Sequence, residues 1–362
     1  MKEIFCKRIN NLKKILKNSD EAVFLTNEVN VGYFSGFQRS EGVMLVTSAS
    51  TYLLVDFRYF EAAQKNAINC KVVCFKKLSE DILKICKSES IKNLYFESSD
   101  ITLARFKLFK NAFEKDGVSS VSDSDLDNLI SDIRCIKDKY EIEKIQQAQN
   151  IAEKAYLEVL NYVKVGAKES YISARLEYFM KLYGAQKASF DLITVTGKKT
   201  SLPHGVPSDD VINEGDFFTC DFGAIYDGYC SDTTRTVAVK SATEEMQKVY
   251  NIVLNAQLSA LETVKPGVLC SDVDNTARDI IKQAGYSDFF GHATGHGVGL
   301  EIHEAPTVSF RSKTALKPGM VITDEPGIYL PDKFGVRIED MLCVTEDGYK
   351  NFVKLPKQLV IV

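Results

Sequence analysis

Residues 216–239 read DFFTCDFGAIYDGYCSDTTRTVAV, a pattern typical of a β-hairpin. Two runs rich in aromatic and β-branched residues flank the pair Asp227-Gly228, which favours a tight turn between antiparallel strands. Asp221 precedes this turn and Asp232 follows it, so a hairpin can bring both carboxylates together on one face. Because two carboxylates at close range repel each other, this stretch predicts bound cations.

Histidine is scarce in this chain and is confined to its second half. The four residues are His204, His292, His296 and His303, and the last three lie in the segment GHATGHGVGLEIHE, residues 291–304. The glycines of this segment allow the backbone to approach a ligand closely. A neutral imidazole here can bind a metal, while a neighbouring imidazole hydrogen-bonds a substrate carbonyl.

Five side chains in this half have the chemistry that a pair of hard divalent cations needs. Each lies in an apolar or glycine-rich context of an expected strand, where an unpaired charge is costly. Any one of them alone is explained as an ordinary surface charge, but the set predicts a metal site: Asp221, Asp232, His296, Glu325 and Glu339. Arg337, two residues before Glu339, is predicted to orient a ligating carboxylate, with a surface salt bridge as the alternative.

Length and composition limit the class of protein. With 362 residues the chain is long enough for two domains, and a net charge of −4 gives no reason to expect nucleic acid or an anionic membrane as partner. No run of apolar residues is long enough to span a bilayer. Nine irregularly spaced cysteines predict reduced thiols and a cytoplasmic protein. Cys220 is expected to pack in the core, facing away from Asp221.

The first part of the chain alternates between helix and strand patterns. Strands are expected at 22–26, 42–47, 51–56, 71–75 and 93–97, and helices at 2–17, 56–66, 78–87 and 102–113. This alternation predicts an α/β domain, and no glycine-rich phosphate loop follows any of the strands. A shift in composition between about 118 and 138, where the chain is rich in Ser and Asp, indicates a boundary at 125, within about ten residues, which gives domains 1–125 and 126–362.

The second part contains an internal repeat about 101 residues long. A helical pattern at 139–163 is followed by VKVGAKES, and another at 244–263 is followed by VKPGVLCS. Each predicts a long helix, a glycine turn and a second helix that starts near Ser170 or Ser271, where serine is a good cap. Segments rich in strands and containing histidine follow both. Two similar halves predict a pseudo-symmetric α+β domain with the site at their junction.

Together with the motifs PHG, TGHGVGLEIHE, EPGIY and VRIED, the five ligand positions resemble the pita-bread metallopeptidases, and within them aminopeptidase P and prolidase. In the first half NVGYFSGF and DFRYFEAA are similar to the creatinase-type domain of those enzymes. The resemblance covers almost the whole chain. It implies an α+β pita-bread catalytic domain with a pseudo-two-fold repeat, preceded by an α/β creatinase-type amino-terminal domain.

The resemblance also implies a role for each site residue. Two divalent ions, commonly manganese and sometimes cobalt or zinc, would lower the pKa of water and supply hydroxide at neutral pH. In such a centre Asp221 chelates one ion, Asp232 and Glu339 bridge both, and His296 and Glu325 complete the other. Glu325 would also shuttle the proton to the leaving amine. His204 and His303 would stabilise the oxyanion, while His292 shapes the substrate pocket. Relatives of this kind are often homodimers or homotetramers.

Three positions depart from the usual pattern of such enzymes. Asp324 replaces an apolar residue directly before Glu325, and we expect it to face away from the metals and to alter packing rather than activity. Lys198 and Lys199 replace smaller or polar residues before Pro203-His204. With these two lysines, the resemblance does not fix the substrate specificity that this loop confers.

The leading hypothesis is a metal-dependent Xaa-Pro aminopeptidase, which cuts between an amino-terminal residue and a following proline of a peptide. The alternative is an Xaa-Pro dipeptidase, or prolidase. Methionine aminopeptidase and creatine amidinohydrolase share the fold, but the first usually lacks the large amino-terminal domain and the second lacks the acidic ligand set. A hypothesis of a different class is a non-catalytic pita-bread module that binds peptides or proteins.

Overall fold

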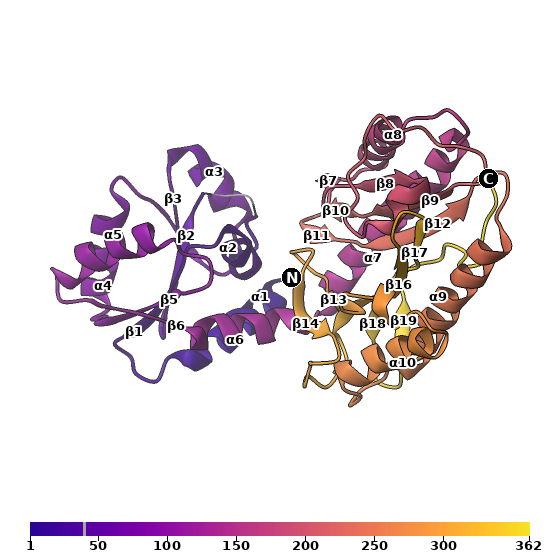
Figure 1. Cartoon of the computed structure of the whole chain (residues 1–362). Coiled ribbons are helices and arrows are strands. Elements are labelled where there is room, and N and C mark those ends of the chain that lie inside the picture. Colours follow the sequence, from indigo (N-terminus) through magenta and orange to yellow (C-terminus); the bar gives the residue numbers. More distant parts are fainter. Residues whose placement is uncertain (39–40) are drawn as a thin grey trace. The chain divides into compact units, whose positions relative to one another are not determined.

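The computed structural model describes residues 1–38 and 41–362 and divides into two compact units, Met1–Arg134 and Cys135–Val362 (Figure 1). The division lies within the ten-residue margin around the expected boundary at 125. The Ser- and Asp-rich segment forms the strand β6 (Ser119–Asp123) and then the helix α6 (Ser124–Cys135), in which Leu126 and Ile130 are buried. Most of α6 therefore belongs to the first unit, and the chain passes to the second unit at its end.

The first unit is built on one mixed sheet in the order β4-β3-β2-β1-β5-β6. Strands β1, β2 and β3 pair antiparallel, whereas β4 pairs parallel with β3, and β5 and β6 continue parallel from β1. The expected α/β class is thus confirmed. The strands are β1 (Glu21–Leu25), β2 (Val43–Thr47), β3 (Thr51–Val55), β4 (Lys71–Cys74), β5 (Asn93–Glu97) and β6 (Ser119–Asp123).

The helices of this unit are α1 (Lys2–Leu12), which continues into η1 (Lys13–Ile15), α2 (Glu28–Ser35), α3 (Phe57–Asn66), α4 (Leu78–Ser88) and α5 (Leu103–Glu114). Asp56 caps α3 and Thr102 caps α5 through their side-chain oxygens. The rings of Phe24 and Phe96 meet edge to face in the core. Sequence patterns missed α2 because this helix is buried on nearly all sides and shows no amphipathic stripe.

The second unit confirms the predicted repeat. Its helix pairs are α7 (Lys139–Val159), extended by η2 (Leu160–Tyr162), with α8 (Glu169–Leu182), and α9 (Glu244–Thr263) with α10 (Cys270–Gln283). Gly166 and Gly267 turn the chain between the helices with φ of 84° and 85°. Their amides donate to Ile212 O and Leu316 O, both at 2.8 Å, so the two turns share one hydrogen-bond pattern.

The predicted serine caps are wrong. Lys168 and Leu269 precede the second helix of each pair, and neither helix has a side-chain cap. Ser170 lies in the first turn of α8, where its hydroxyl donates to Asp209 at 3.2 Å. The two bridges Lys168–Val211 and Leu269–Ala315 tie the helix starts to extended chain, which explains why no capping serine is required there.

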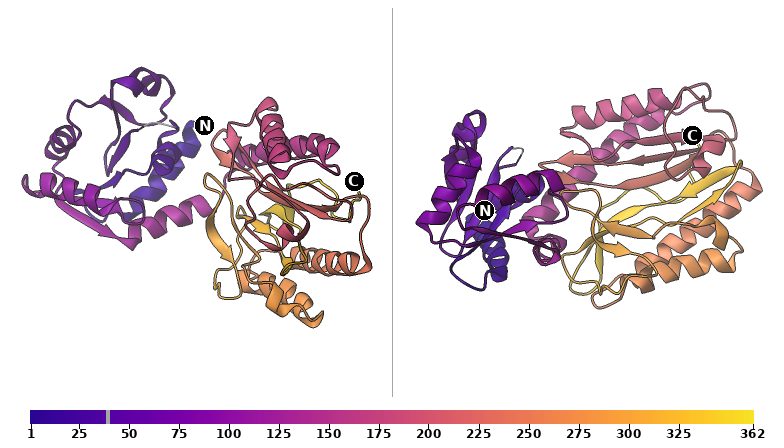
Figure 2. Two further views of the ribbon diagram at one scale, coloured as in Figure 1. Left: turned by 45° about the horizontal axis from the view of Figure 1, so that its top comes forward. Right: turned by 60° about the vertical axis from the view of Figure 1, so that its left-hand side comes forward.

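Strands of the two halves form two main sheets, β12-β9-β8 and β14-β13-β15-β18-β19, with small sheets β11-β10-β7 and β16-β17. In Figure 2 the pair α7–α8 covers one side of these strands and the pair α9–α10 the other. The strands are β7 (Lys187–Ala188), β8 (Ile193–Thr196), β9 (Phe217–Phe222), β10 (Ala224–Tyr226), β11 (Tyr229–Cys230), β12 (Thr233–Ala238), β13 (Gly295–Gly297), β14 (Glu304–Val308), β15 (Val321–Asp324), β16 (Gly327–Leu330), β17 (Phe334–Arg337), β18 (Asp340–Val344) and β19 (Tyr349–Asn351). Short 3₁₀ turns are η3 (Gly197–Ser201) and η4 (Ser287–Phe289).

Two hydrophobic clusters hold these layers together. Tyr156 of α7 stacks on Phe222 of β9 at 4.8 Å in the first cluster. Tyr250 of α9 lies 6.3 Å from Phe217 of the same strand in the second. Side chains of β9 therefore alternate between two faces: Phe218, Cys220 and Phe222 pack in the first cluster, whereas Phe217 packs in the second. In the part of the chain that the structure describes, no helix is both long and apolar enough to cross a membrane.

Candidate metal centre

The hairpin predicted at 216–239 forms and brings two acids to one pocket. Strands β9 and β12 pair antiparallel, and the turn has positive φ at Asp227 (49°) and Gly228 (84°), as a tight two-residue turn requires. Cys220 packs in the core beside α7 and α8 as expected, so its neighbour Asp221 faces the opposite side. Asp232 lies directly before β12 and is buried.

The second half supplies the remaining three predicted ligands. His296 lies in the middle of β13 and Glu325 directly follows β15, as expected. Glu339, expected on a strand, lies instead in the link between β17 and β18, two residues after Arg337. Gly295 permits β13 to pack closely on β15, because a Cβ atom at this position would lie 2.1 Å from Thr323 O. The backbone amide of His296 donates a hydrogen bond to Thr323 Oγ1 at 3.1 Å. This bond helps to fix the backbone position from which the imidazole extends.

All five predicted ligands line one pocket of about 620 Å³. Ligand atoms of Asp232, His296 and Glu339 all lie within 4.8 Å of one another. His296 Nε2 is 3.4 Å from Glu325 Oε1 and 3.5 Å from Asp232 Oδ2. Asp221 forms an ion pair with Arg337 at 2.6 Å.

Burial and the charges of neighbouring acids raise the pKa of three carboxyls in the pocket, those of Asp232, Glu325 and Glu339. Burial raises the pKa of Asp232 well above its usual range, and the charge of Asp221 raises it further. Burial, then the charge of Asp232, does the same to the pKa of Glu339. The pKa of Glu325 rises to about 8 through burial, although Arg337 opposes the shift. Burial lowers the pKa of His296 to about 4, so this imidazole is neutral at physiological pH.

These residues fit a centre of divalent cations. The buried Asp221 Oδ1 has no hydrogen-bond partner among the described residues, an arrangement that is costly for a carboxylate. A neutral imidazole and several oxygens of closely packed carboxylates are the donors that hard or borderline dications accept. Cations bound here would relieve the repulsion among the acids and favour their ionised forms.

Arg337 is buried and connects the two sides of the site, so the alternative of a surface salt bridge is wrong. Its Nη2 donates to Asp221 at 2.6 Å, and its Nε donates to Thr234 Oγ1 at 3.0 Å. The Thr234 hydroxyl in turn donates to Glu339 Oε2 at 2.7 Å. One guanidinium thus orients a carboxylate from each half of the repeat.

Three other histidines, His204, His292 and His303, line the same pocket. The His303 ring lies 4.4 Å from the His296 ring. His292 Nε2 is 2.8 Å from the Tyr329 hydroxyl, which accepts a hydrogen bond from Arg337 Nη1 at 3.0 Å. Burial lowers the pKa of His292 to about 4, so its Nε2 can accept from the tyrosine.

Sequence reasoning missed Tyr329, although the residue lies in the quoted motif EPGIY. The available signal was the position of this tyrosine on a short strand directly after Glu325. It also missed the apolar part of the pocket lining, which includes Phe190, Leu192 and Ile302. No charge or motif marks these residues, and their place follows only from the fold.

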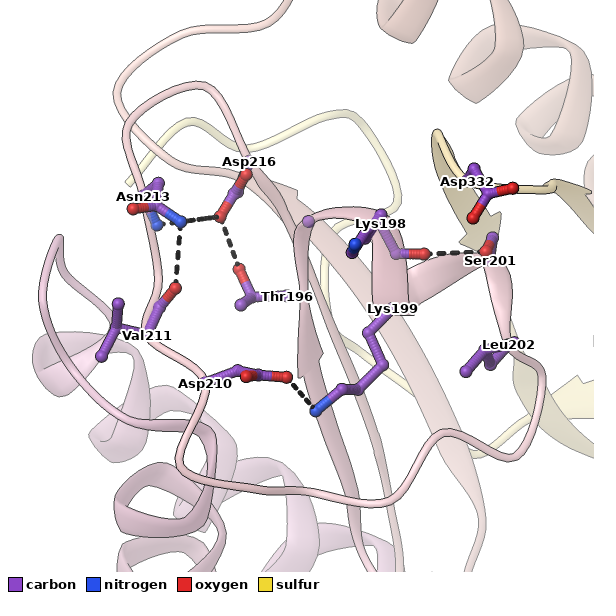
Figure 3. Close-up of a pocket in the computed structure, with 11 residues that line it drawn as sticks. Thr196, Lys198, Lys199, Ser201, Leu202, Asp210, Val211, Asn213, Asp216 and Asp332 are labelled. Carbon is purple, nitrogen blue, oxygen red and sulfur yellow. Dashed lines mark hydrogen bonds and ion pairs between the residues drawn. The ribbon is translucent and has the colours of Figure 1, made fainter.

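The departures from the family pattern lie outside the pocket lining. Asp324 is fully buried and pairs with Asp340 across β15 and β18. It does not line the pocket of the predicted ligands, in line with the expectation that it faces away from the metals, and neither of its oxygens has a hydrogen-bond partner among the described residues. Lys198 and Lys199 line a second cavity of about 570 Å³ (Figure 3). Neither lysine lines the pocket that holds the predicted ligands.

The chain belongs to metallopeptidase family M24. The model of that family matches residues 143–346, and the model of the creatinase/prolidase amino-terminal domain matches residues 8–136. The pita-bread fold with a creatinase-type first domain is thereby confirmed, and the chain is a hydrolase.

Relatives of known name are similar over nearly the full length. An Xaa-Pro dipeptidase from Pyrococcus furiosus is 42% identical over 98% of this chain and 99% of its own. The solved structure of an Xaa-Pro dipeptidase from Bacillus anthracis has a TM-score of 0.94 at 40% identity, covering 99% of this chain and 100% of that one. An X-Pro aminopeptidase structure from Thermotoga maritima has a TM-score of 0.89 at 36% identity, covering 98% and 99%. Of the two predicted activities, these relatives favour the alternative, the dipeptidase.

Proposed function

We propose that this chain is an Xaa-Pro dipeptidase that uses two divalent metal ions. The observation that carries the proposal is the convergence of five hard or imidazole ligands, three further histidines and a buried arginine on one pocket. The similarity to dipeptidases from Pyrococcus furiosus and Bacillus anthracis gives the substrate class. The substrates would be dipeptides with proline in the second position.

In this proposal Asp221, Asp232, His296, Glu325 and Glu339 hold the metal ions. The ions, when bound, supply Lewis acidity and lower the pKa of water to near neutrality. Manganese is our choice of metal, with cobalt or zinc as alternatives, because oxygen-rich sites with one imidazole accept all three. We also propose a cytoplasmic location and a homodimer or homotetramer, following the sequence prediction.

Each remaining side chain of the pocket has a proposed task. Glu325 would take a proton from the attacking water and deliver it to the leaving nitrogen of proline. His204 and His303 would donate hydrogen bonds to the oxyanion, and His292 would shape the pocket. Arg337 would keep Asp221 and Glu339 in place. The apolar side chains of Phe190, Leu192 and Ile302 provide a wall for the pyrrolidine ring, which has no N–H to satisfy.

Paired peptide substrates test the substrate class. Manganese-loaded protein would be given Ala-Pro and a longer Ala-Pro-Xaa-Xaa peptide, with release of alanine measured for each. Faster cleavage of the dipeptide supports the proposal. Faster cleavage of the longer peptide supports the aminopeptidase, which stays the second candidate because of the Thermotoga maritima structure. Inactivity on both, with less than one bound divalent ion per chain, would favour the non-catalytic binding module.

Glu325→Gln tests the proton shuttle. The substitution keeps the size of the side chain but removes its acid–base chemistry, and we expect turnover to fall by about 10²–10⁴-fold. Glu346→Gln, at an exposed position outside the pocket, is the matched control and should leave turnover unchanged. More than a tenth of wild-type turnover in Glu325→Gln, with normal folding by circular dichroism, would exclude this role.

A further inference from the structure

The loop between β8 and β9 carries His204 into the pocket without fixing its ring. His204 is exposed, and none of its ring atoms has a recorded hydrogen bond in the described part of the chain. Nearby contacts use the backbone: Arg337 Nη1 donates to Pro203 O at 3.2 Å, and Gly205 N donates to Leu202 O at 3.0 Å. The position of the imidazole therefore depends on how the loop itself is held.

One buried carboxylate joins the two ends of this loop, at Thr196 and Ser208, which together we call its neck. Glu169, in the first turn of α8, is fully buried. Its Oε1 accepts from the amide of Thr196 at 2.8 Å, where β8 ends and the loop begins. Its Oε2 accepts from the amide of Ser208 at 3.0 Å, where the loop returns. A single side chain thus ties together two points of the backbone on either side of His204.

Lys199 neutralises this carboxylate and reinforces the neck. Its Nζ lies 2.6 Å from Glu169 Oε2 and 2.6 Å from Ser208 Oγ. The same ammonium forms an ion pair with Asp210 at 2.5 Å, drawn in Figure 3. The side chain of Lys199 is 19% exposed, so much of this network is shielded from water, where ion pairs are stronger than at the surface.

The loop lies between two cavities, so its neck has to keep the loop, and with it His204, from shifting. Leu202 lines the cavity of about 570 Å³ shown in Figure 3, whereas Pro203 and His204 line the candidate active site. Open space on both sides leaves room for the loop to shift. Displacements of about 1 Å in a catalytic group can lower turnover by about 10²-fold.

We propose that Lys199 and Glu169 are positioning residues that hold His204 in the active site by closing the neck of its loop. Neither side chain lines the active-site pocket, so their effect would pass through the backbone. The effect on turnover rests on the function proposed above, but the position of His204 can be measured without it.

Four histidines make a direct measurement practical. Zinc-loaded protein labelled with ¹³C at histidine Cε1 would give four resonances, and His204→Ala identifies that of His204. We expect Lys199→Met to shift or broaden the His204 resonance and to leave the other three in place. Lys198→Met is the matched control, because Lys198 is exposed and no ion pair is recorded for it among the described residues. Lys199→Arg should restore the wild-type spectrum in part. An unchanged His204 resonance in Lys199→Met would overturn the proposal.

A double-mutant cycle on turnover provides the second test. We expect Lys199→Met to lower kcat by about tenfold with little change in KM, and to have less than about a twofold effect when His204 is already alanine. Equal losses in both backgrounds would mean a general structural role and would also overturn the proposal. If the wild-type enzyme cleaves neither peptide, the proposed function fails, and the histidine spectra still decide whether Lys199 positions His204.

Discussion

Glu325 and Arg337 show how single side chains organise this site. Arg337 reaches Asp221 directly, Glu339 through Thr234, and His292 through a tyrosine hydroxyl. These hydrogen bonds fix the orientation of the ligands. They also offset the free-energy cost of burying these polar side chains. Arg337 also opposes the rise in the pKa of Glu325, but burial dominates, so the metal-free carboxyl has a pKa of about 8.

This pKa predicts a dependence of stability on pH. The pKa of Glu325 is raised above its unfolded value of about 4.3, so its contribution to stability is present at low pH and lost as pH rises toward 8. Metal ions favour the ionised form and should remove this loss. We therefore expect the gain in Tm on adding manganese to grow between pH 6.5 and 8. Each kcal/mol gained in the free energy of unfolding should raise Tm by roughly 2–4 °C. Thermal unfolding with manganese and with EDTA measures it.

The lower limit of pH 6.5 excludes the effect of histidine protonation on stability. His292 and His296 have pKa values of about 4 in the folded protein, so their neutral forms lower its stability only at more acidic pH. In Glu325→Gln the gain in Tm should depend less on pH. A gain that is constant from pH 6.5 to 8 in the wild type would contradict the prediction.

At the scale of elements, close packing of β13 on β15 determines where His296 lies. The Cα of Gly295 faces the backbone of Thr323, and a Cβ there would lie 2.1 Å from the carbonyl oxygen and 2.7 Å from the carbonyl carbon. Backbone atoms inside a sheet cannot move aside as a flexible side chain can. The strand pair therefore requires glycine next to the histidine.

Gly295→Ala should consequently separate β13 from β15. We expect a loss of about 1–3 kcal/mol in the free energy of unfolding from overpacking. Manganese affinity should fall by about 10–100-fold, since the support of a ligand is displaced. Urea unfolding and calorimetric titration measure the two effects.

Gly291→Ala is the matched control, because nothing lies within 4 Å of a Cβ at that position. It should leave stability and metal affinity unchanged. Wild-type manganese affinity in Gly295→Ala would show that the spacing of β13 and β15 does not position His296.

At the scale of the catalytic unit, buried polar contacts join the two halves of the repeat. Arg235 of β12 forms an ion pair with Asp340 of β18 at 2.8 Å, and both side chains are almost fully buried. The same guanidinium donates to Glu339 O at 2.6 Å, directly beside the site. Since the metal ligands come from both halves, we expect these contacts to help hold the ligands of the two halves together.

Arg235→Met should be strongly destabilising, because it leaves Asp340 buried without one of its cationic partners. Removal of one member of a buried pair costs about 3–5 kcal/mol. Lys333→Met is the control: its ion pair with Glu245 has side chains 58% and 49% exposed and should contribute about 0–1 kcal/mol. Urea unfolding of both variants measures the difference. Similar small losses in the two variants would refute a structural role for the buried pair.

The sequence by itself determined most elements, the repeat, and the five ligands and four histidines that gather in the pocket. Local patterns suffice for these: the Asp227-Gly228 turn, the alternation of β9 and the glycines around His296 act over a few residues. Only the tertiary structure placed Tyr329 between His292 and Arg337, and Glu169 at the neck of the His204 loop. These contacts join residues far apart in the chain, and no local pattern encodes such distances. Buried helix α2 was missed for a related reason, because contacts on all its sides remove the amphipathic signal.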